Sequence, residues 1–245
     1  MEQTCRRAVK LGLPAIAFTE HADFVQAFEN QHPVDVAGYL ECVERCRAAC
    51  PGLRILTGVE LGEPHWFPHR TSAVLGTGRI ERILGSVHCL KIDGEPVDMS
   101  QGVLTAERAP ALMREYLRET LALADSGQPF EVLAHLDYPK RYWPHDGLPH
   151  REQDYEEEYR AVLRAAARRE AVLEVNTTRG LEPARGLCPG PVVLGWWREE
   201  GGRAVSFGSD AHDPSKIAAG FTAAARLVEA AGFKPAKEPT DFWRR

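Results

Sequence analysis

The sequence predicts an α/β fold, in which parallel strands form a barrel and helices cover its outside. Short apolar runs alternate along the chain with longer segments whose apolar residues recur at a helical period, and this alternation implies a parallel sheet. Runs such as 131–134 and 171–175 lack the polar alternation of a half-exposed strand, which fits strands buried on both faces. A chain of 245 residues suits one such barrel.

The expected elements follow one another in a regular order. Strands are predicted at 14–19, 53–59, 82–88, 130–136, 171–176 and 203–208, and helices at 2–11, 36–50, 105–126, 152–169, 191–200 and 215–231. The helix over 105–126 illustrates the pattern, because Met113, Tyr116 and Leu117 share one helical face that would lie on the sheet. No internal repeat or linker divides the chain, so we expect residues 1–245 to form a single domain.

The composition argues against several classes of protein. A net charge of −5 is unfavourable for a nucleic-acid surface, which needs clustered Lys and Arg. The apolar runs are far shorter than the roughly 18 residues that a membrane span requires, and the N-terminus lacks the apolar core of a signal peptide. We therefore expect a cytoplasmic protein whose partner is a small molecule.

The six cysteines, at 5, 42, 46, 50, 89 and 188, are interpreted as free thiols, because disulfides are rare in cytosolic chains of this length. Cys42, Cys46 and Cys50 repeat every four residues on one face of the helix predicted at 36–50. Three thiols on one face could hold a soft metal. The favoured interpretation is that these small side chains pack against the barrel.

Metal-ligand side chains stand where the predicted strands end. The apolar runs lead into His21, Glu60, His88, His135 and the pair Asp210 and His212, and one further run ends in Asn176. In a barrel of parallel strands all carboxyl-terminal strand ends face the same rim, so we expect these side chains to converge. Imidazole and carboxylate together suit zinc, manganese or iron(II), and a carboxylate can bridge two cations.

A site with two or three divalent metals would activate a water and neutralise a phosphoryl group during attack. The ligand set therefore predicts hydrolysis of a phosphate ester. Lys140, Arg141 and Asn176 are expected over the same rim, where two cations and an amide could bind phosphate oxygens, and Arg179 is a further candidate. For both arginines the alternative is an ordinary surface cation.

Two long loops, 61–79 and 137–150, are rich in proline, aromatic residues and histidine. Loops that follow ligand-bearing strands commonly form the walls of a substrate pocket. The alternative is that their histidines are solvated loop residues; this alternative covers His32, His65, His69, His145 and His150.

The chain resembles a known family, the PHP (polymerase and histidinol phosphatase) domain, in its histidinol-phosphatase-like branch. The resemblance covers nearly the whole chain and lies in six segments: Thr19-Glu20-His21-Ala22-Asp23, Gly58-Val59-Glu60, Gly85-Ser86-Val87-His88, Ala134-His135-Leu136-Asp137, Glu174-Val175-Asn176-Thr177 and Gly208-Ser209-Asp210-Ala211-His212. It implies a distorted, TIM-like (β/α)₇ barrel with a trinuclear metal cluster. By resemblance, Glu60 bridges two metals, His88 and His135 complete one of these, Asp210 binds the other, and His21 with His212 holds the third.

The sequence departs from the family pattern at its start. Family members begin with a strand that carries Asp-x-His-x-His, and this chain has no such segment. The first strand of the barrel and two histidines are therefore expected to be missing, which leaves Glu60, His88 and His135 as the metal site with its full set of ligands. We expect either that the true start lies upstream or that the chain is a fragment.

The resemblance implies a metal-dependent phosphatase that converts L-histidinol phosphate to L-histidinol in histidine biosynthesis. Two alternatives stay open. The same metals could serve another small ester, such as a nucleotide or sugar phosphate, since one fold hosts several activities. A chain without its first strand could also be an inactive PHP module that only binds.

Overall fold

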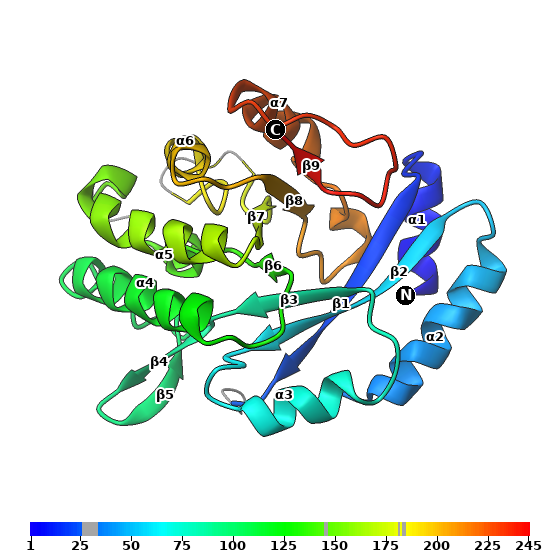
Figure 1. The fold of residues 1–245 in the computed structure, drawn as a ribbon, viewed down its shortest axis with the longest axis horizontal. Coiled ribbons are helices and arrows are strands. Elements are labelled where there is room, and N and C mark those ends of the chain that lie inside the picture. Colours follow the sequence, from blue (N-terminus) through cyan, green and yellow to red (C-terminus); the bar gives the residue numbers. More distant parts are fainter. Residues whose placement is uncertain (26–33, 145–146, 181, 183–184) are drawn as a thin grey trace.

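The computed structural model describes residues 1–25, 34–144, 147–180, 182 and 185–245, and its centre is a curled sheet (Figure 1). The strands of this sheet, in spatial order, are β1 (Ala15–Asp23), β2 (Arg54–Gly62), β3 (Arg82–Ser86), β6 (Val132–Leu133), β7 (Val172–Asn176), β8 (Ala204–Gly208) and β9 (Trp243–Arg244). Neighbours from β1 to β8 pair in parallel, and β9 pairs antiparallel with β8. The predicted α/β class and its parallel sheet are confirmed.

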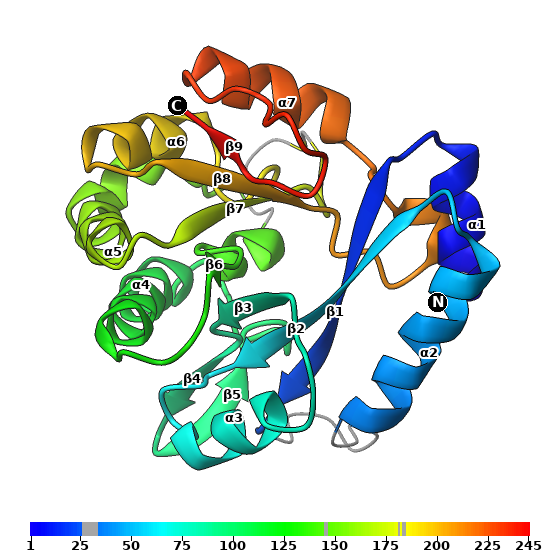
Figure 2. The ribbon, with the colours of Figure 1, turned by 45° about the vertical axis from the view of Figure 1, so that its right-hand side comes forward.

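Helices cover the outer face of the curl, as Figure 2 shows. They are α1 (Glu2–Lys10), α2 (Val36–Ala49), α3 (Pro68–Leu75), α4 (Ala109–Asp125), α5 (Glu156–Arg168), α6 (Pro191–Glu199) and α7 (Phe221–Ala230). Short 3₁₀ turns occupy Tyr138–Tyr142, Glu152–Tyr155 and Pro214–Lys216. The predicted face of α4 is buried, since Met113, Tyr116 and Leu117 are all 0 % exposed.

Regular structure also occurs in segments where no helix or strand was predicted. Within 61–79, α3 begins at Pro68, a residue whose fixed φ favours the first turn of a helix. After β3 the chain forms a hairpin of β4 (Cys89–Ile92) and β5 (Glu95–Asp98). Asp93 and Gly94 at its tip both have positive φ, as a tight two-residue hairpin turn requires.

Two strands differ in length from the prediction, and the difference positions the site. β1 continues to Asp23 and pairs with β2 in continuous register, so that His21 lies opposite Glu60. β6 is only two residues long. Beyond it, the backbone N–H of His135 donates to the carboxylate of Glu174 instead of to a neighbouring strand, which releases the chain from the sheet at the predicted ligand.

The small core between α1, α2 and the sheet contains the cysteine cluster. Cys5 and Cys46 are 0 % exposed, and Cys42 and Cys50 pack against them as partly buried residues. All four thiols are free. Their contacts are those of small apolar side chains in a core, in line with the favoured interpretation of the sequence.

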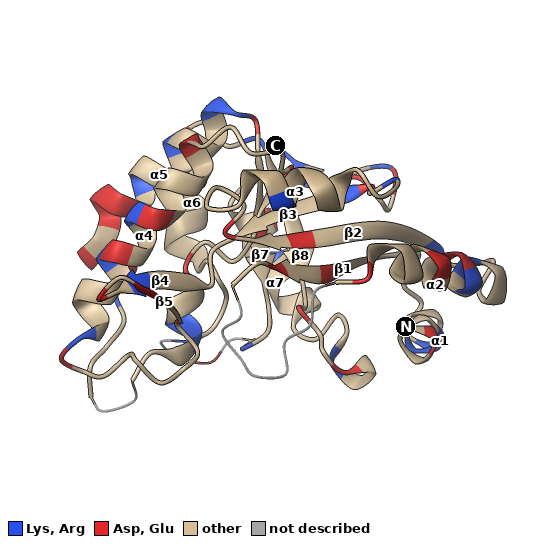
Figure 3. Ribbon diagram, turned by 90° about the horizontal axis from the view of Figure 1, so that it is seen from below, with Lys and Arg blue, Asp and Glu red and all other residues tan. Residues whose placement is uncertain are grey.

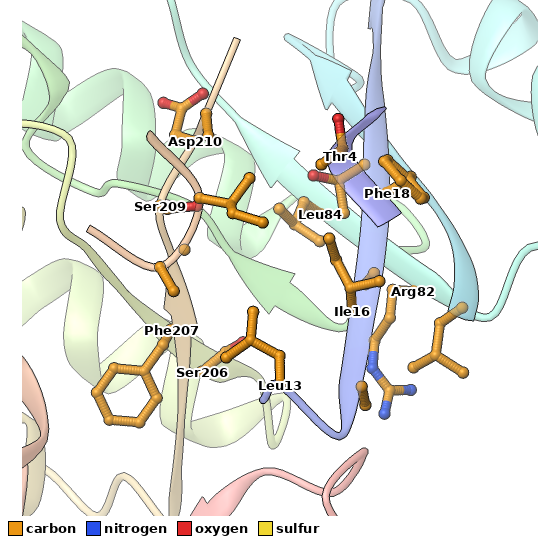
Figure 4. A pocket seen from close by; sticks show the side chains of 18 of the residues that line it. Thr4, Leu13, Ile16, Phe18, Arg82, Leu84, Ser206, Phe207, Ser209 and Asp210 are labelled. Carbon is orange, nitrogen blue, oxygen red and sulfur yellow. The ribbon is translucent and has the colours of Figure 1, made fainter. Parts of the chain in front are cut away.

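The sheet is open between β1 and β8, which do not pair with each other within the described residues. A cavity of about 940 Å³ lies between them. Figure 4 shows its walls, with Ile16 and Phe18 on the β1 side and Ser206 and Phe207 on the β8 side. One end of this cavity reaches the carboxyl-terminal strand ends, because Asp210 also lines it.

Charged residues of both signs occur on the same outer helices, as on α4 and α5 in Figure 3. On α5, acidic residues stand in the first turn and Arg168 in the last, an order that the helix dipole favours. Among the described residues, none of the helices combines the length and the apolar character that a membrane crossing demands.

Candidate metal centre

The carboxyl ends of β1, β2, β3 and β6 bring four predicted ligands into contact. Oε1 of Glu60 lies 2.8 Å from Nε2 of His135 and 3.1 Å from Nε2 of His88. The ring of His21 has its centroid 5.5 Å from that of His88, and the register of β1 and β2 pairs His21 with Glu60. Glu60 therefore lies at the centre of three imidazoles.

The donor atoms form two groups that could each hold a cation. One consists of His21, Glu60 and His88, the other of His21, Asp210 and His212, and within each group the ligand atoms lie within 4.8 Å of one another. His21 belongs to both. Nitrogen and carboxylate oxygen are the donors that zinc and other divalent transition metals accept, so the residues fit such ions. All six predicted ligands thus come together, His135 through its contact with Glu60.

Buried opposite charges control the protonation of this cluster. Glu60 is 4 % exposed; burial alone would raise its pKa, but His21, His135 and His88 together hold the pKa well below its ordinary value. The Glu60 carboxylate in turn raises the pKa of His21 to about 9, against the opposing effect of burial. A cation that binds His21 would have to displace the imidazole proton, so metal affinity should increase with pH.

A carboxylate that the sequence prediction did not include, Asp23, lies behind two of the histidines. Its Oδ2 is 3.3 Å from Nδ1 of His21, and its Oδ1 is 3.3 Å from Nδ1 of His88. Burial raises the pKa of Asp23, but its close contacts with the two imidazoles outweigh burial and lower it. Asp23 stands in the first motif segment, yet only the extended β1 reveals that it points to the cluster.

Two further buried carboxylates, also absent from the prediction, hold the backbone of two histidines that are predicted ligands. Glu63 accepts from the N–H groups of His88 and Cys89, at 2.5 and 2.9 Å. Glu174 accepts from the N–H of His135 at 2.8 Å. Burial raises the pKa of both carboxyls. Glu174 lies within a motif segment, whereas no pattern in the sequence singles out Glu63.

Two of the predicted phosphate-binding residues lie at the edge of the cluster. Nη1 of Arg141 is 2.7 Å from Oδ2 of Asp210, while its Nε and Nη2 are buried and have no hydrogen-bond partner in the described part of the chain. Nδ2 of Asn176 lies 3.4 Å from the same oxygen of Asp210. Arg141 is 5 % exposed, so its unused N–H groups represent an unsatisfied requirement for an acceptor.

The other two predicted phosphate contacts lie apart from the cluster. The ammonium group of Lys140 donates to Oε1 of Glu152 at 2.8 Å and to the carbonyl of Leu187 at 2.9 Å in a buried network. Arg179 is exposed and lies over the ring of Tyr142, 6.0 Å from its centroid. Arg179 thus lies outside the cluster, and Lys140 stabilises the fold through its buried hydrogen bonds.

The loop histidines have different environments. His65 contacts Glu119 on α4, with Nε2 2.6 Å from the carboxylate, and His150 packs between Trp143 and Tyr155. His69 is exposed on α3. His32 and His145 lie outside the described residues. Neither His65 nor His150 is a solvated loop residue, because both rings make specific contacts.

Comparison with known proteins identifies the family. The model of the PHP domain matches residues 1–178, a segment that includes His21, Glu60, His88 and His135 but ends before Asp210. The chain belongs to the PHP domain family. Family membership agrees with the resemblance seen in the motifs.

Two curated relatives are similar over most of the PHP chain. A histidinol-phosphatase from Lactococcus lactis is 26 % identical over 228 residues, which is 92 % of this chain and 83 % of the relative. A protein named "probable histidinol-phosphatase" from Clostridium acetobutylicum is 27 % identical over 224 residues, 90 % of this chain and 83 % of the relative. The relatives are thus matched over most of their own length.

A solved structure has a similar fold. The crystal structure of histidinol phosphate phosphatase from Lactococcus lactis, in complex with zinc, L-histidinol and phosphate, superimposes with a TM-score of 0.81 at 24 % identity. The superposition covers 95 % of this chain and 87 % of that one. The curled PHP sheet described above is therefore the fold of that protein as well.

Proposed function

We propose that this PHP domain is a metal-dependent phosphoesterase whose substrate is L-histidinol phosphate. The observation that carries the proposal is the buried carboxylate of Glu60 among three imidazoles, beside Arg141, whose buried Nε and Nη2 have no hydrogen-bond partner among the described residues. The first feature suits divalent cations and the second suits a phosphate. The names of the curated relatives support the choice of ester.

The proposed ligands are His21, Glu60, His88, His135, Asp210 and His212, as the sequence predicted. Mixed nitrogen and oxygen donors support zinc or manganese and also accommodate iron(II). When bound, divalent cations supply Lewis acidity, which makes water a better nucleophile at neutral pH and offsets the negative charge of the phosphoryl group. The protein contributes the fixed arrangement of donors that holds two or three such ions together.

Arg141 is proposed to orient the phosphate. Guanidinium groups bind phosphate oxygens through parallel N–H donors, and the Nε and Nη2 atoms of Arg141 form such a pair. Asp210 fixes the third nitrogen at 2.7 Å, so the fork has a defined direction. The amide of Asn176 lies beside the fork, and its Nδ2 already donates to Glu174 and Asp210, so its contribution to phosphate binding would require it to exchange one of these acceptors. Arg179 and Lys140 are left out of this role, because one is exposed and the other is already bonded to Glu152.

The proposal is tested by phosphate release from L-histidinol phosphate by the purified chain supplied with Zn²⁺ or Mn²⁺. A His135→Ala variant should lose at least about 100-fold in rate, since it removes a proposed ligand, and His69→Ala on the exposed face of α3 is the matched control. The same assay is run with a nucleotide phosphate and a sugar phosphate. If phosphate is released from one of these but not from L-histidinol phosphate, the proposed substrate is wrong. If the chain takes up metal but hydrolyses none of these esters, it is not a phosphoesterase, and a binding module is favoured.

A further inference from the structure

Asp23 occupies a position that no other carboxylate of the cluster shares. Its two oxygens face different histidines, with Oδ2 toward Nδ1 of His21 and Oδ1 toward Nδ1 of His88, each at 3.3 Å. The Asp23 side chain is 16 % exposed, so water competes weakly for these contacts. Both are ion-pair distances, longer than a well-formed hydrogen bond, and contacts of this kind are often long before a site takes up its ligand.

The position matters because a neutral imidazole carries a single ring proton. A metal binds the nitrogen that lacks this proton, and the partner of the other nitrogen decides which one that is. A carboxylate at Nδ1 holds the proton there and leaves Nε2 free. Nε2 of His88 points to Oε1 of Glu60 at 3.1 Å, so the geometry directs this nitrogen into the cluster.

The backbone of β2 makes room for the carboxylate. Asp23 pairs with Gly62 in the β1–β2 register, and a Cβ at position 62 would lie 2.3 Å from Oδ1 of Asp23. Any side chain larger than hydrogen would therefore push the carboxylate away from His88. The absence of a side chain at Gly62 is a requirement of the Asp23 contacts rather than of the backbone, since its φ is not positive.

We propose that Asp23 is a positioning residue that holds His21 and His88 as Nδ1–H tautomers and thereby couples the two cation groups. His21 belongs to both groups and His88 to one of them, so a single carboxylate orients ligands of both. Once the His21 ring is oriented for binding one cation, it is also oriented for binding the other. The proposal rests on the proposed function only in requiring that this site binds metal ions, and it does not depend on the identity of the ester.

The test measures Zn²⁺ affinity by competition with a chromophoric chelator in three variants of the full chain. Asp23→Ala removes both acceptor oxygens and should weaken binding 10- to 100-fold, the usual effect of losing a carboxylate partner of a ligand histidine. Asp23→Asn keeps one acceptor oxygen and should fall between Asp23→Ala and the parent. Gly62→Ala changes no ligand and no charge, yet should weaken binding because it displaces the carboxylate.

Two controls separate positioning from general damage to the fold. Gly52→Ala adds a Cβ that meets nothing within 4 Å, and Asp125→Asn removes an exposed carboxylate that pairs with Arg168; both should bind Zn²⁺ like the parent. Circular dichroism checks folding. If either Asp23 variant fails to fold, Gly62→Ala still reports on the proposal.

Long-range ¹H–¹⁵N NMR of the Zn²⁺-loaded protein gives a readout that a purely structural role would not change. The parent should show His21 and His88 protonated at Nδ1 and bound through Nε2, and Asp23→Ala should lose this pattern. Unchanged affinity in Asp23→Ala and Gly62→Ala, or Nδ1 coordination in the parent, overturns the inference. Tight Zn²⁺ binding without phosphate release would overturn the proposed enzymatic function but not the role of Asp23, whereas a parent that takes up no Zn²⁺ overturns both.

Discussion

At the scale of single residues, His150 shows how burial changes the chemistry of a side chain. Its ring centroid lies 4.8 Å from that of Trp143 and 5.8 Å from that of Tyr155, and its Nε2 is buried without a hydrogen-bond partner among the described residues. Burial, with a smaller effect of Lys140, lowers the pKa of His150 to about 3. The folded protein therefore keeps this imidazole neutral at pH values where an unfolded chain would protonate it.

The pKa of His150 predicts a loss of stability in mild acid. Between the unfolded pKa of about 6.5 and the folded pKa of about 3, the unfolded chain binds the additional proton, so the free energy of unfolding decreases as pH decreases. From pH 7.5 to 5 this amounts to at most about 2 kcal/mol. His150→Phe should remove that share of the pH dependence. Urea unfolding of the parent and of His150→Phe at pH 7.5 and pH 5 measures this difference. An equal decrease in the free energy of unfolding in both proteins would disprove the prediction.

The convergence of the predicted ligands could be inferred from the sequence, but the residues that contact and support them could not. His21, Glu60 and His135 follow apolar runs, and parallel strands bring their ends to one edge, so their meeting could be predicted. Asp23 and Glu63 act through side-chain direction and through backbone N–H groups. Such contacts depend on strand register and on the residue at which each strand ends, and neither can be predicted from a pattern of residue types.

At the scale of elements, Tyr39 joins α2 to the pair β1 and β2. Its hydroxyl accepts from the N–H of Gly58 at 2.8 Å and donates to the carbonyl of Phe18 at 3.0 Å. The ring is buried, and burial raises the pKa of Tyr39 to about 12, so the hydroxyl keeps its proton. One helix side chain thus satisfies a backbone group on each of two neighbouring strands.

Tyr39→Phe should destabilise this pair of strands without creating a cavity. The substitution leaves the N–H of Gly58 and the carbonyl of Phe18 without their partner, at a cost of about 1–3 kcal/mol. Chemical denaturation should show this decrease with an unchanged m-value. Since His21 and Glu60 follow Phe18 and Gly58 closely on the same strands, we also expect weaker Zn²⁺ binding. A change in unfolding free energy below about 0.5 kcal/mol would contradict the assigned hydrogen bonds.

Most elements were predictable, and the exceptions have a common cause. Long periodic segments such as α4 and apolar runs such as β7 were found because their burial imposes a pattern on the sequence. α3, the hairpin of β4 and β5, and the two-residue β9 were not predicted. All are short, and the form of α3 and of the hairpin depends on a proline start and a tight turn rather than on periodicity.

At the scale of the whole molecule, the open side of the sheet and the metal centre are connected. β1 and β8 line opposite walls of the cavity of about 940 Å³. The group formed by His21, Asp210 and His212 spans this opening, because His21 lies on β1 and the other two follow β8. A cation held there would join two strands that no backbone hydrogen bonds connect.

Metal binding should therefore stabilise the molecule, and the stabilisation should depend on His212. At a free Zn²⁺ concentration of 100 times Kd, binding adds about 2.7 kcal/mol, which corresponds to a rise in Tm of roughly 5–10 °C for a chain of this size. The side chain of His212 is 73 % exposed, so His212→Ala should leave the Tm in EDTA nearly unchanged. It should, however, reduce the rise caused by Zn²⁺. Scanning calorimetry with and without Zn²⁺ tests this, with His69→Ala as the control; an equal Zn²⁺-induced rise in both variants would show that the cation does not join β1 to β8.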